Sequence, residues 1–152
     1  MKNYENCKYT YIHRKILMFL VNYYIADGEM KTEMIKRAKK HDLDKMLLYI
    51  SIDKRLASGI HKDTASHHLN NSIVKTKYDY IEAALDWESC RYSKVDKPLD
   101  AYNTLYKYYP KFEKEMLEVF KFLNINGRNN RKDPTVEKYR SEEHTSELQS
   151  QP

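Results

Sequence analysis

The sequence predicts an all-α fold, a compact bundle of about five main helices, and three observations lead to this prediction. The chain has 152 residues but only three glycines and four prolines, the residues that most often interrupt helices. Long stretches are rich in lysine, glutamate, leucine and methionine, which favour helical backbone. No segment alternates apolar and polar residues over a length that would predict a strand.

Apolar residues recur at helical spacing in five long segments that turn residues separate. The first segment carries Ile12 and Ile16 on one face and ends at the turn "ADG" (26–28). Pro98 and Pro110 suit the first turns of the last two helices, where a proline costs no hydrogen bond. The expected long helices cover 8–26, 30–50, 77–92, 98–109 and 110–123, with shorter helices around Leu56 and over 65–71.

The chain is expected to form one helical domain over 1–125, followed by a flexible basic extension over 126–139. The segment "RSEEHTSELQSQ" (140–151) resembles the in-frame translation of a sequencing-library adapter. We therefore expect 140–152 to be a disordered tail without function. Setting it aside removes one arginine and three glutamates, which raises the net charge from +5 to +7.

Cysteine use and hydropathy indicate a cytoplasmic protein. Cys7 and Cys90 lie far apart and form no CxxC pair, so the sequence predicts neither a disulfide framework nor a zinc ribbon. The apolar run over 16–26 contains Asn22 and is too short for a membrane span. It is interpreted as a buried helix and not as a signal peptide.

His41 and Asp42 adjoin in the stretch "KRAKKHDLDKM" (36–46). On a helix over 30–50, His41 continues the inward stripe that contains Ala38, and Asp42 lies on the neighbouring stripe. Both side chains should then point toward the interior edge, where a carboxylate needs a cation or hydrogen-bond donors. An alternative is a core histidine beside a carboxylate that pairs with Arg37, with Lys45 or with a backbone amide.

Two partners on other predicted helices favour a site. His13 lies on the inward stripe of the first helix, and His13 and His41 are each fourteen residues from Asp27. An antiparallel hairpin would place their imidazoles at the same level. Asp86 precedes the only tryptophan in an apolar segment, where a carboxylate is unusual; an ion pair with an arginine is the alternative.

Three more histidines lie between these elements. His67 and His68 are adjacent, so we expect only one of them to face the site, and we expect His61 to lie on the surface. Two imidazoles and two carboxylates form a mixed donor set that suits a divalent Mn, Fe, Co, Ni, Zn or Mg ion.

The order His13, then His41-Asp42, then Asp86 resembles the HD-domain superfamily of metal-dependent phosphohydrolases. The stretches "KKHDLDKM", "ASHHLNN" and "DWESCRYSKVDKPLDAYNTLYKYYP" are similar, more narrowly, to a family of small bacterial and phage helical proteins of unknown function. This resemblance covers 11–125 and implies an HD-domain-like fold. The superfamily's glutamate after the motif has no clear counterpart, and Asp44 and Asp63 are only loose substitutes, so the general acid is unassigned.

The resemblance also implies roles for single residues. The metal ligands would be His13, His41, Asp42 and Asp86, and His67 or His68 would be an additional ligand or substrate contact. Lys45 and Arg37, one turn after and one turn before His41, could neutralise phosphate oxygens. Ordinary solvated cations are the alternative at both positions.

The resemblance thus implies a metal-dependent phosphohydrolase, with a phosphorylated small molecule or nucleotide as its substrate. Two alternatives remain. The interleaved lysines and tyrosines of "KYTYIHRK" and "NTLYKYYPKFEK" could bind nucleic acid through phosphate contacts and stacking. The domain could also bind a metal without turnover and act through a protein partner. Neither the oligomeric state nor the substrate follows from the sequence.

Overall fold

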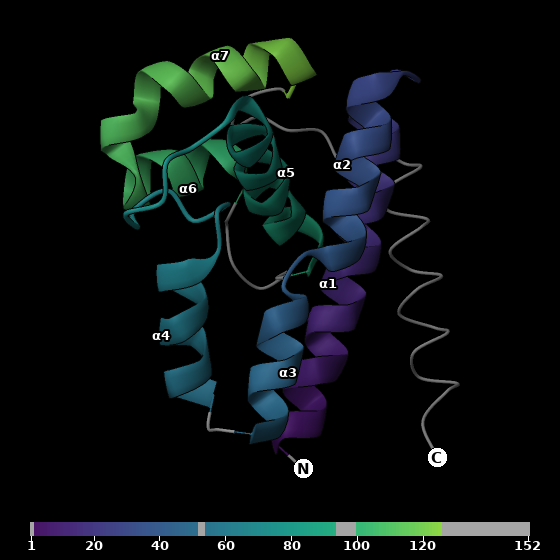
Figure 1. The fold of residues 1–152 in the computed structure, drawn as a ribbon. Helices are drawn as coiled ribbons and strands as arrows, with labels where there is room; N and C mark the ends of the chain where they lie inside the picture. The colour runs from purple at the N-terminus through teal and green to yellow at the C-terminus, as the bar shows by residue number, and fades with distance from the viewer. Residues whose placement is uncertain (1, 52–53, 94–99, 126–152) are drawn as a thin grey trace.

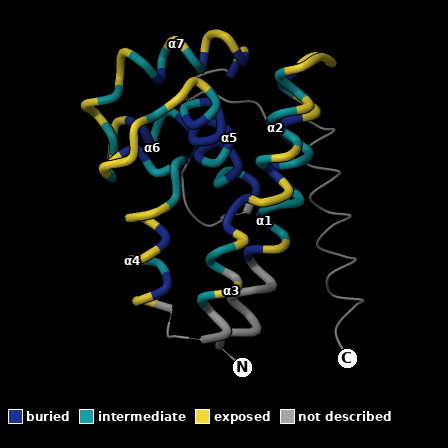
Figure 2. The backbone as a smooth tube through the Cα atoms, viewed as in Figure 1, coloured by how far each residue is buried: buried dark blue, intermediate teal, exposed yellow. Residues whose placement is uncertain are grey.

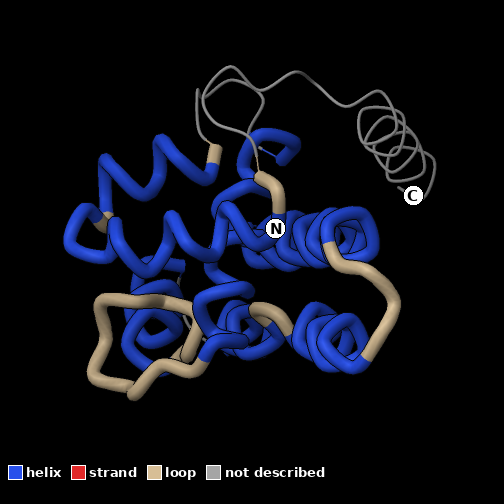
Figure 3. Tube along the Cα trace, turned by 90° about the horizontal axis from the view of Figure 1, so that it is seen from above, coloured by secondary structure: helices blue, strands red, loops and turns tan. Residues whose placement is uncertain are grey.

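The computed structural model describes residues 2–51, 54–93 and 100–125, and every regular element among them is helical (Figures 1 and 3). The prediction of an all-α fold is therefore confirmed. The extension over 126–139, the tail over 140–152 and Pro98 lie outside the described residues. The elements are α1 (Lys2–Tyr24), α2 (Glu29–Lys40), α3 (Leu43–Ser51), α4 (Lys54–Thr64), α5 (Lys77–Ser93), α6 (Ala101–Tyr108), η1 (Pro110–Phe112) and α7 (Glu113–Leu123).

Two predicted helices differ from the structure. The single helix expected over 30–50 is wrong, because it is divided into α2 and α3 at His41 and Asp42. The helix expected over 65–71 is also wrong, because α4 ends at Thr64 and a loop continues to Thr76. In this loop the Lys75 ammonium donates hydrogen bonds to the carbonyl oxygens of Ser66 and His68, each at 2.7 Å. These bonds satisfy carbonyl groups that a helix would have paired with backbone N–H groups.

Helix α5 lies at the centre of the molecule and packs against α1, α2, α6 and α7 (Figure 1). Its start is set by a capping box, in which the Thr76 backbone N–H donates to the Asp79 carboxylate at 2.8 Å and the Thr76 hydroxyl faces the Asp79 N–H at 3.4 Å. Nearly all side chains between Ile81 and Ser89 are buried (Figure 2). A helix that is covered on most of its surface organises the core around it.

The rest of the core comes from α1, α6 and α7. Leu17 and Leu20 of α1, Leu105 of α6 and Phe120 of α7 are all essentially inaccessible. The turn between α1 and α2 contains Gly28 with φ of 153°, a backbone conformation that side chains with a Cβ rarely adopt. This turn reverses the chain, so α2 packs back along α1. Among the described residues, no helix combines the length and the hydropathy that a bilayer crossing requires.

Candidate metal centre

The break between α2 and α3 brings both residues of the His41-Asp42 pair to one place. Asp42 has φ of 56°, in the left-handed region, where aspartate is tolerated better than most residues. The helix ends there, and the two side chains no longer diverge as neighbours on a helix do. His41 and Asp42 are 1% and 7% exposed, so both are removed from water. The interior position expected from the sequence is correct, but a helix end produces it and not a continuous helix face.

The four residues expected as metal ligands come together. His13 Nε2 lies 3.3 Å from His41 Nε2 and 2.6 Å from Asp86 Oδ1. His41 Nε2 lies 3.3 Å from Asp86 Oδ1 and 3.4 Å from Asp42 Oδ1. Neighbouring ligand atoms of a divalent ion with bonds of about 2.1 Å are about 3.0 Å apart in an octahedron and about 3.4 Å apart in a tetrahedron. The three distances that involve His41 therefore match those between ligands of one ion, and the contact of His13 with Asp86 is shorter.

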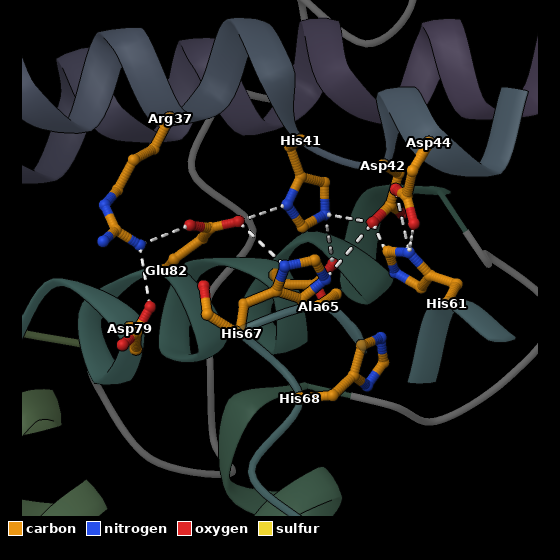
Figure 4. A network of polar contacts seen from close by, with 12 residues as sticks. Arg37, His41, Asp42, Asp44, His61, Ala65, His67, His68, Asp79 and Glu82 are labelled. Carbon is orange, nitrogen blue, oxygen red and sulfur yellow. Dashed lines mark hydrogen bonds and ion pairs between the residues drawn. The ribbon is translucent and has the colours of Figure 1, made fainter. Parts of the chain in front are cut away.

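A second group of histidines adjoins the first through Asp42 (Figure 4). Asp42 Oδ1 lies 2.8 Å from His61 Nε2 and 3.2 Å from His67 Nε2. His61, His67 and His68 each offer a nitrogen, and these atoms lie within 4.8 Å of one another. The surface position expected for His61 is wrong, since this residue of α4 is 1% exposed. His67 contacts Asp42, whereas His68 adjoins the rings of His61 and His67, so the expectation that only one of the two faces the site stays a prediction.

Four of these rings have an acceptor behind Nδ1, which fixes the nitrogen that faces the centre. Nδ1 of His41 and Nδ1 of His67 lie 2.8 Å and 3.0 Å from one oxygen of Glu82. Nδ1 of His61 lies 2.8 Å from the carboxylate of Asp44. A carboxylate can only accept, so each of these rings carries a proton on Nδ1, and Nε2 is the nitrogen that is available to a metal ion when it is not itself protonated.

His13 follows the same rule through a hydroxyl group. Its Nδ1 lies 3.3 Å from Ser89 Oγ, and that hydroxyl donates its own proton to the Asp86 carbonyl oxygen at 2.6 Å. The serine oxygen is thus left as an acceptor for the His13 Nδ1–H. Nε2 of His13 then faces Asp86 Oδ1 at 2.6 Å, a contact that is favourable when either a proton or a metal ion lies between the two atoms.

Three buried atoms of the second group have no hydrogen-bond partner within the described part of the chain. They are Asp42 Oδ1, His61 Nε2 and His67 Nε2. They lie close to one another, yet their directions are not those of hydrogen bonds. Buried polar atoms are normally satisfied, and unpaired donor atoms that converge are typical of metal ligands.

The carboxylates make the centre strongly favourable for positive charge. Burial opposes the charged form of His41, but Asp42 and Asp86 outweigh burial and hold its pKa well above the ordinary value. Burial likewise opposes charge on His61, where Asp42 and Asp44 raise the pKa to about 9. Protons can supply this positive charge, and so can a divalent ion, which competes with them for the same Nε2 atoms.

Two other groups near the centre have lowered pKa values. Burial alone would raise the pKa of Glu82, but hydrogen bonds from His41 and His67 lower it to about 2. Burial and the neighbouring charge of His67 lower the pKa of His68 to about 3. Glu82 is therefore an acceptor over the whole working range of pH, and His68 is a neutral ring with an available lone pair.

Of the two expected phosphate contacts, Arg37 is directed away from the Nε2 atoms. Arg37 Nη1 donates to Asp79 and to Glu82, each at 3.0 Å, so its contacts are on the side of Glu82 away from the Nε2 atoms (Figure 4). Lys45 is half-buried on α3. A phosphate contact from either residue stays a prediction, and the contacts of Arg37 support a role in holding Glu82.

The residues present fit a divalent ion, because buried imidazole and carboxylate donors converge and outer acceptors set the tautomers. The class of protein defined by fold and site is an all-helical protein with a buried His/Asp centre able to hold metal. Comparisons with protein-family models, curated proteins and solved structures find no match for the chain. The assignment therefore rests on geometry and donor chemistry.

Sequence reasoning missed Glu82 and Ser89, placed His61 on the surface, and considered Asp44 only as a loose substitute for the superfamily's glutamate. Glu82 had a readable signal, because it lies four residues before Asp86 and so shares its side of the predicted helix over 77–92. His61 had a weaker signal, four residues after Ala57, which is fully buried. Asp44 and Ser89 had none, because their partners lie on other elements.

Proposed function

We propose that this protein is a metal-dependent phosphohydrolase of the HD-domain type, acting on a phosphate ester of a small molecule or nucleotide. The observation that carries the proposal is the position of Asp42 Oδ1, which lies between the Nε2 atoms of His41, His61 and His67 at 3.4, 2.8 and 3.2 Å. One carboxylate oxygen that adjoins two groups of ligands suits two neighbouring ions, an arrangement common among enzymes that cleave phosphate esters.

Two sets of residues would hold these ions. Three groups of donor atoms each lie within 4.8 Å of one another: His13, His41 and Asp42; His41, His67 and Asp86; and His61, His67 and His68. From these groups we assign His13, His41, Asp42 and Asp86 to the first ion and Asp42, His61, His67 and His68 to the second. A divalent ion bound there supplies Lewis acidity, which lowers the pKa of a water molecule and polarises a phosphoryl oxygen. Asp42 and Asp86 balance part of its charge, and the buried position strengthens their attraction for it.

The remaining parts of the mechanism belong to side chains near the centre. Lys45 lies at the start of α3, close in sequence to Asp42, and would neutralise phosphate oxygens. Arg37 would keep Glu82 in place and contribute to the positive charge felt by the substrate. Nδ1–H groups held by Glu82, Asp44 and Ser89 would keep the imidazoles in the tautomer that leaves Nε2 available.

The test measures metal and turnover together in the full chain and in two matched variants. The parent should contain about two equivalents of a transition metal by elemental analysis. It should hydrolyse p-nitrophenyl phosphate or a nucleoside monophosphate with added Mn²⁺ or Co²⁺. Asp42→Asn should lose more than about 90% of both properties, because the amide keeps the shape but not the charge. Asp27→Asn, at an exposed carboxylate of the turn between α1 and α2, should keep both.

Three results would contradict the proposal in different ways. Near-zero metal in parent and variant alike would remove the metal centre. Full metal content without hydrolysis of any phosphate ester would leave a metal-binding protein that is not a hydrolase. Salt-dependent affinity for DNA or RNA that survives His41→Ala would favour the basic nucleic-acid-binding alternative.

A further inference from the structure

Glu82 connects the two groups of ligands through a single oxygen atom. It lies on α5, one turn before Asp86, and is 6% exposed. Its Oε2 accepts from Nδ1 of His41 at 2.8 Å and from Nδ1 of His67 at 3.0 Å. His41 belongs to the first group and His67 to the second, so one carboxylate oxygen is shared between a ligand of each.

The other oxygen of Glu82 is held by Arg37. Arg37 Nη1 donates to Glu82 Oε1 and to Asp79 Oδ1, each at 3.0 Å (Figure 4). Asp79 is itself fixed at the start of α5, where its second oxygen accepts from the Thr76 backbone N–H at 2.8 Å. The carboxylate of Glu82 is thus clamped between a donor on one side and two rings on the other, and it cannot turn without losing one of them.

We propose that Glu82 is a positioning residue for both metal-binding groups: aimed by Arg37, it holds the Nδ1 protons of His41 and His67 and keeps both Nε2 atoms available as ligands. The proposal rests on the metal centre of the proposed function and not on its hydrolytic activity. It predicts that His41 and His67 both lose an available Nε2 when residue 82 can no longer accept from Arg37 with one oxygen and from the two rings with the other. Neither ring has to move for this to happen, because a proton shift from Nδ1 to Nε2 is enough to block the metal.

The variant Glu82→Gln tests this prediction because glutamine has nearly the same shape but only one accepting atom. Arg37 donates, so it should bind the amide oxygen. The amide NH₂ then faces the two Nδ1 atoms, which must become acceptors, and the ring protons move to Nε2. We expect the affinity for Zn²⁺, measured by titration calorimetry, to fall about 10- to 100-fold at both groups.

If the orientation of the residue 82 side chain determines Zn²⁺ affinity, a second substitution at Arg37 should restore that affinity. In Arg37→Met/Glu82→Gln no donor competes for the amide oxygen, so the amide can turn and accept from both rings. We expect the double variant to regain at least about tenfold of the lost Zn²⁺ affinity. A purely structural role of the Arg37–Glu82 ion pair predicts the reverse, a double variant as weak as the single variant or weaker.

The ring protons provide a readout that needs no metal. Long-range ¹H–¹⁵N spectra of the metal-free protein, recorded once the rings are neutral, should place the protons of His41 and His67 on Nδ1 in the parent. They should lie on Nε2 in Glu82→Gln and return to Nδ1 in the double variant. Unchanged tautomers in Glu82→Gln would overturn the proposal, even if the variant binds metal less well.

Glu88→Gln is the matched control. Glu88 is a buried glutamate of the same helix that is also paired with an arginine, Arg91, at 2.8 Å, and within the described part of the chain its hydrogen-bond partners are Tyr24, Arg91 and the Ala101 N–H. We expect it to keep the Zn²⁺ affinity of the parent. Equal losses in Glu88→Gln and Glu82→Gln would overturn the proposal, because general destabilisation would then explain both. A parent that binds Zn²⁺ but hydrolyses no phosphate ester would contradict only the proposed function.

Discussion

Asp42 combines a strained backbone with three close imidazole contacts. Its φ of 56° places a residue other than glycine in the left-handed region, a conformation that costs free energy and is concentrated at functional sites. Its Oδ1 is buried and lies within 3.4 Å of Nε2 on three histidines. The strain is tolerated because a right-handed helical residue here would continue α2 and direct the carboxylate away from the centre.

Two substitutions of Asp42 separate the strain from the ligand role. Asp42→Ala and Asp42→Gly both remove the carboxylate, so both should lose bound metal. Glycine accepts positive φ without strain, whereas alanine does not. The metal-free glycine variant should therefore have a free energy of unfolding about 1 kcal/mol higher than the alanine variant, measured in urea.

Asn124 provides the reference for this comparison. It has φ of 59° at the end of α7, is exposed and lies far along the chain from the centre. Asn124→Gly and Asn124→Ala should differ by the same amount, about 1 kcal/mol, with no change in metal content. Equal stabilities for the two Asp42 variants would show that the backbone strain is relieved when the carboxylate is lost.

His61 tests whether there are two groups of ligands or one. It contacts Asp42 and Asp44 and belongs to the second group only. His61→Gln should lower the metal content from about two equivalents to about one, because His13, His41 and Asp86 still surround the first position. Elemental analysis of the full chain measures this directly. Complete loss of metal in His61→Gln would mean that the histidines form a single centre.

Among the elements, the loop between α4 and α5 is held together by the side chains of Lys75 and Asn71. It contains His67 and His68, and Figure 3 shows it as an extended stretch of irregular backbone. Lys75 Nζ donates to the carbonyl oxygens of Ser66 and His68 and to the side chain of Asn71, all at 2.7 Å. An ammonium group therefore substitutes for the backbone hydrogen bonds that a helix would have provided.

Lys75→Met should loosen this loop while the rest of the bundle stays folded. It removes three hydrogen bonds from one charged donor, which should cost about 1 to 3 kcal/mol locally. Hydrogen exchange of the amides over 65–76 should become faster, and the second equivalent of metal should bind more weakly than the first. Lys62→Met, at an exposed lysine of α4, should change neither measurement. Uniformly faster exchange across α1 and α5 would instead indicate global destabilisation.

For the molecule as a whole, the centre links stability to pH. The folded-state pKa of His61 is about 9 and that of His41 is raised in the same direction, against an ordinary value of 6.5. The metal-free folded protein thus binds more protons than the unfolded chain between these pH values, so its stability falls as pH rises through them. His61 alone accounts for up to about 3 kcal/mol of this change.

Bound metal should reverse this dependence. Metal replaces the protons on Nε2, so its affinity should rise with pH up to about 9, the pKa of His61. Melting temperatures of the metal-free protein should fall between pH 6.5 and 9, while the increase caused by Zn²⁺ should grow over the same range. Parallel curves for the two forms would contradict competition between metal and protons at these imidazoles.

Part of the candidate site could be predicted from the sequence because it depends on local patterns. Helical periodicity placed His13 on the buried face of α1, and equal distances from the 26–28 turn placed it level with His41. Asp86 was noticed because a carboxylate is rare in an apolar helix. The closeness of all three residues agrees with these expectations.

What the sequence by itself determined is the helical class and which polar residues lie on buried helix faces, since both follow from spacing of a few residues. Tertiary structure alone decided the break at Asp42, the inclusion of His61 and the pairing of Glu82 with two rings. These features depend on contacts between α2, α4, α5 and the 65–76 loop. The physical reason is that hydrogen bonds and charges act over a few ångströms in space, whatever the separation of their groups along the chain.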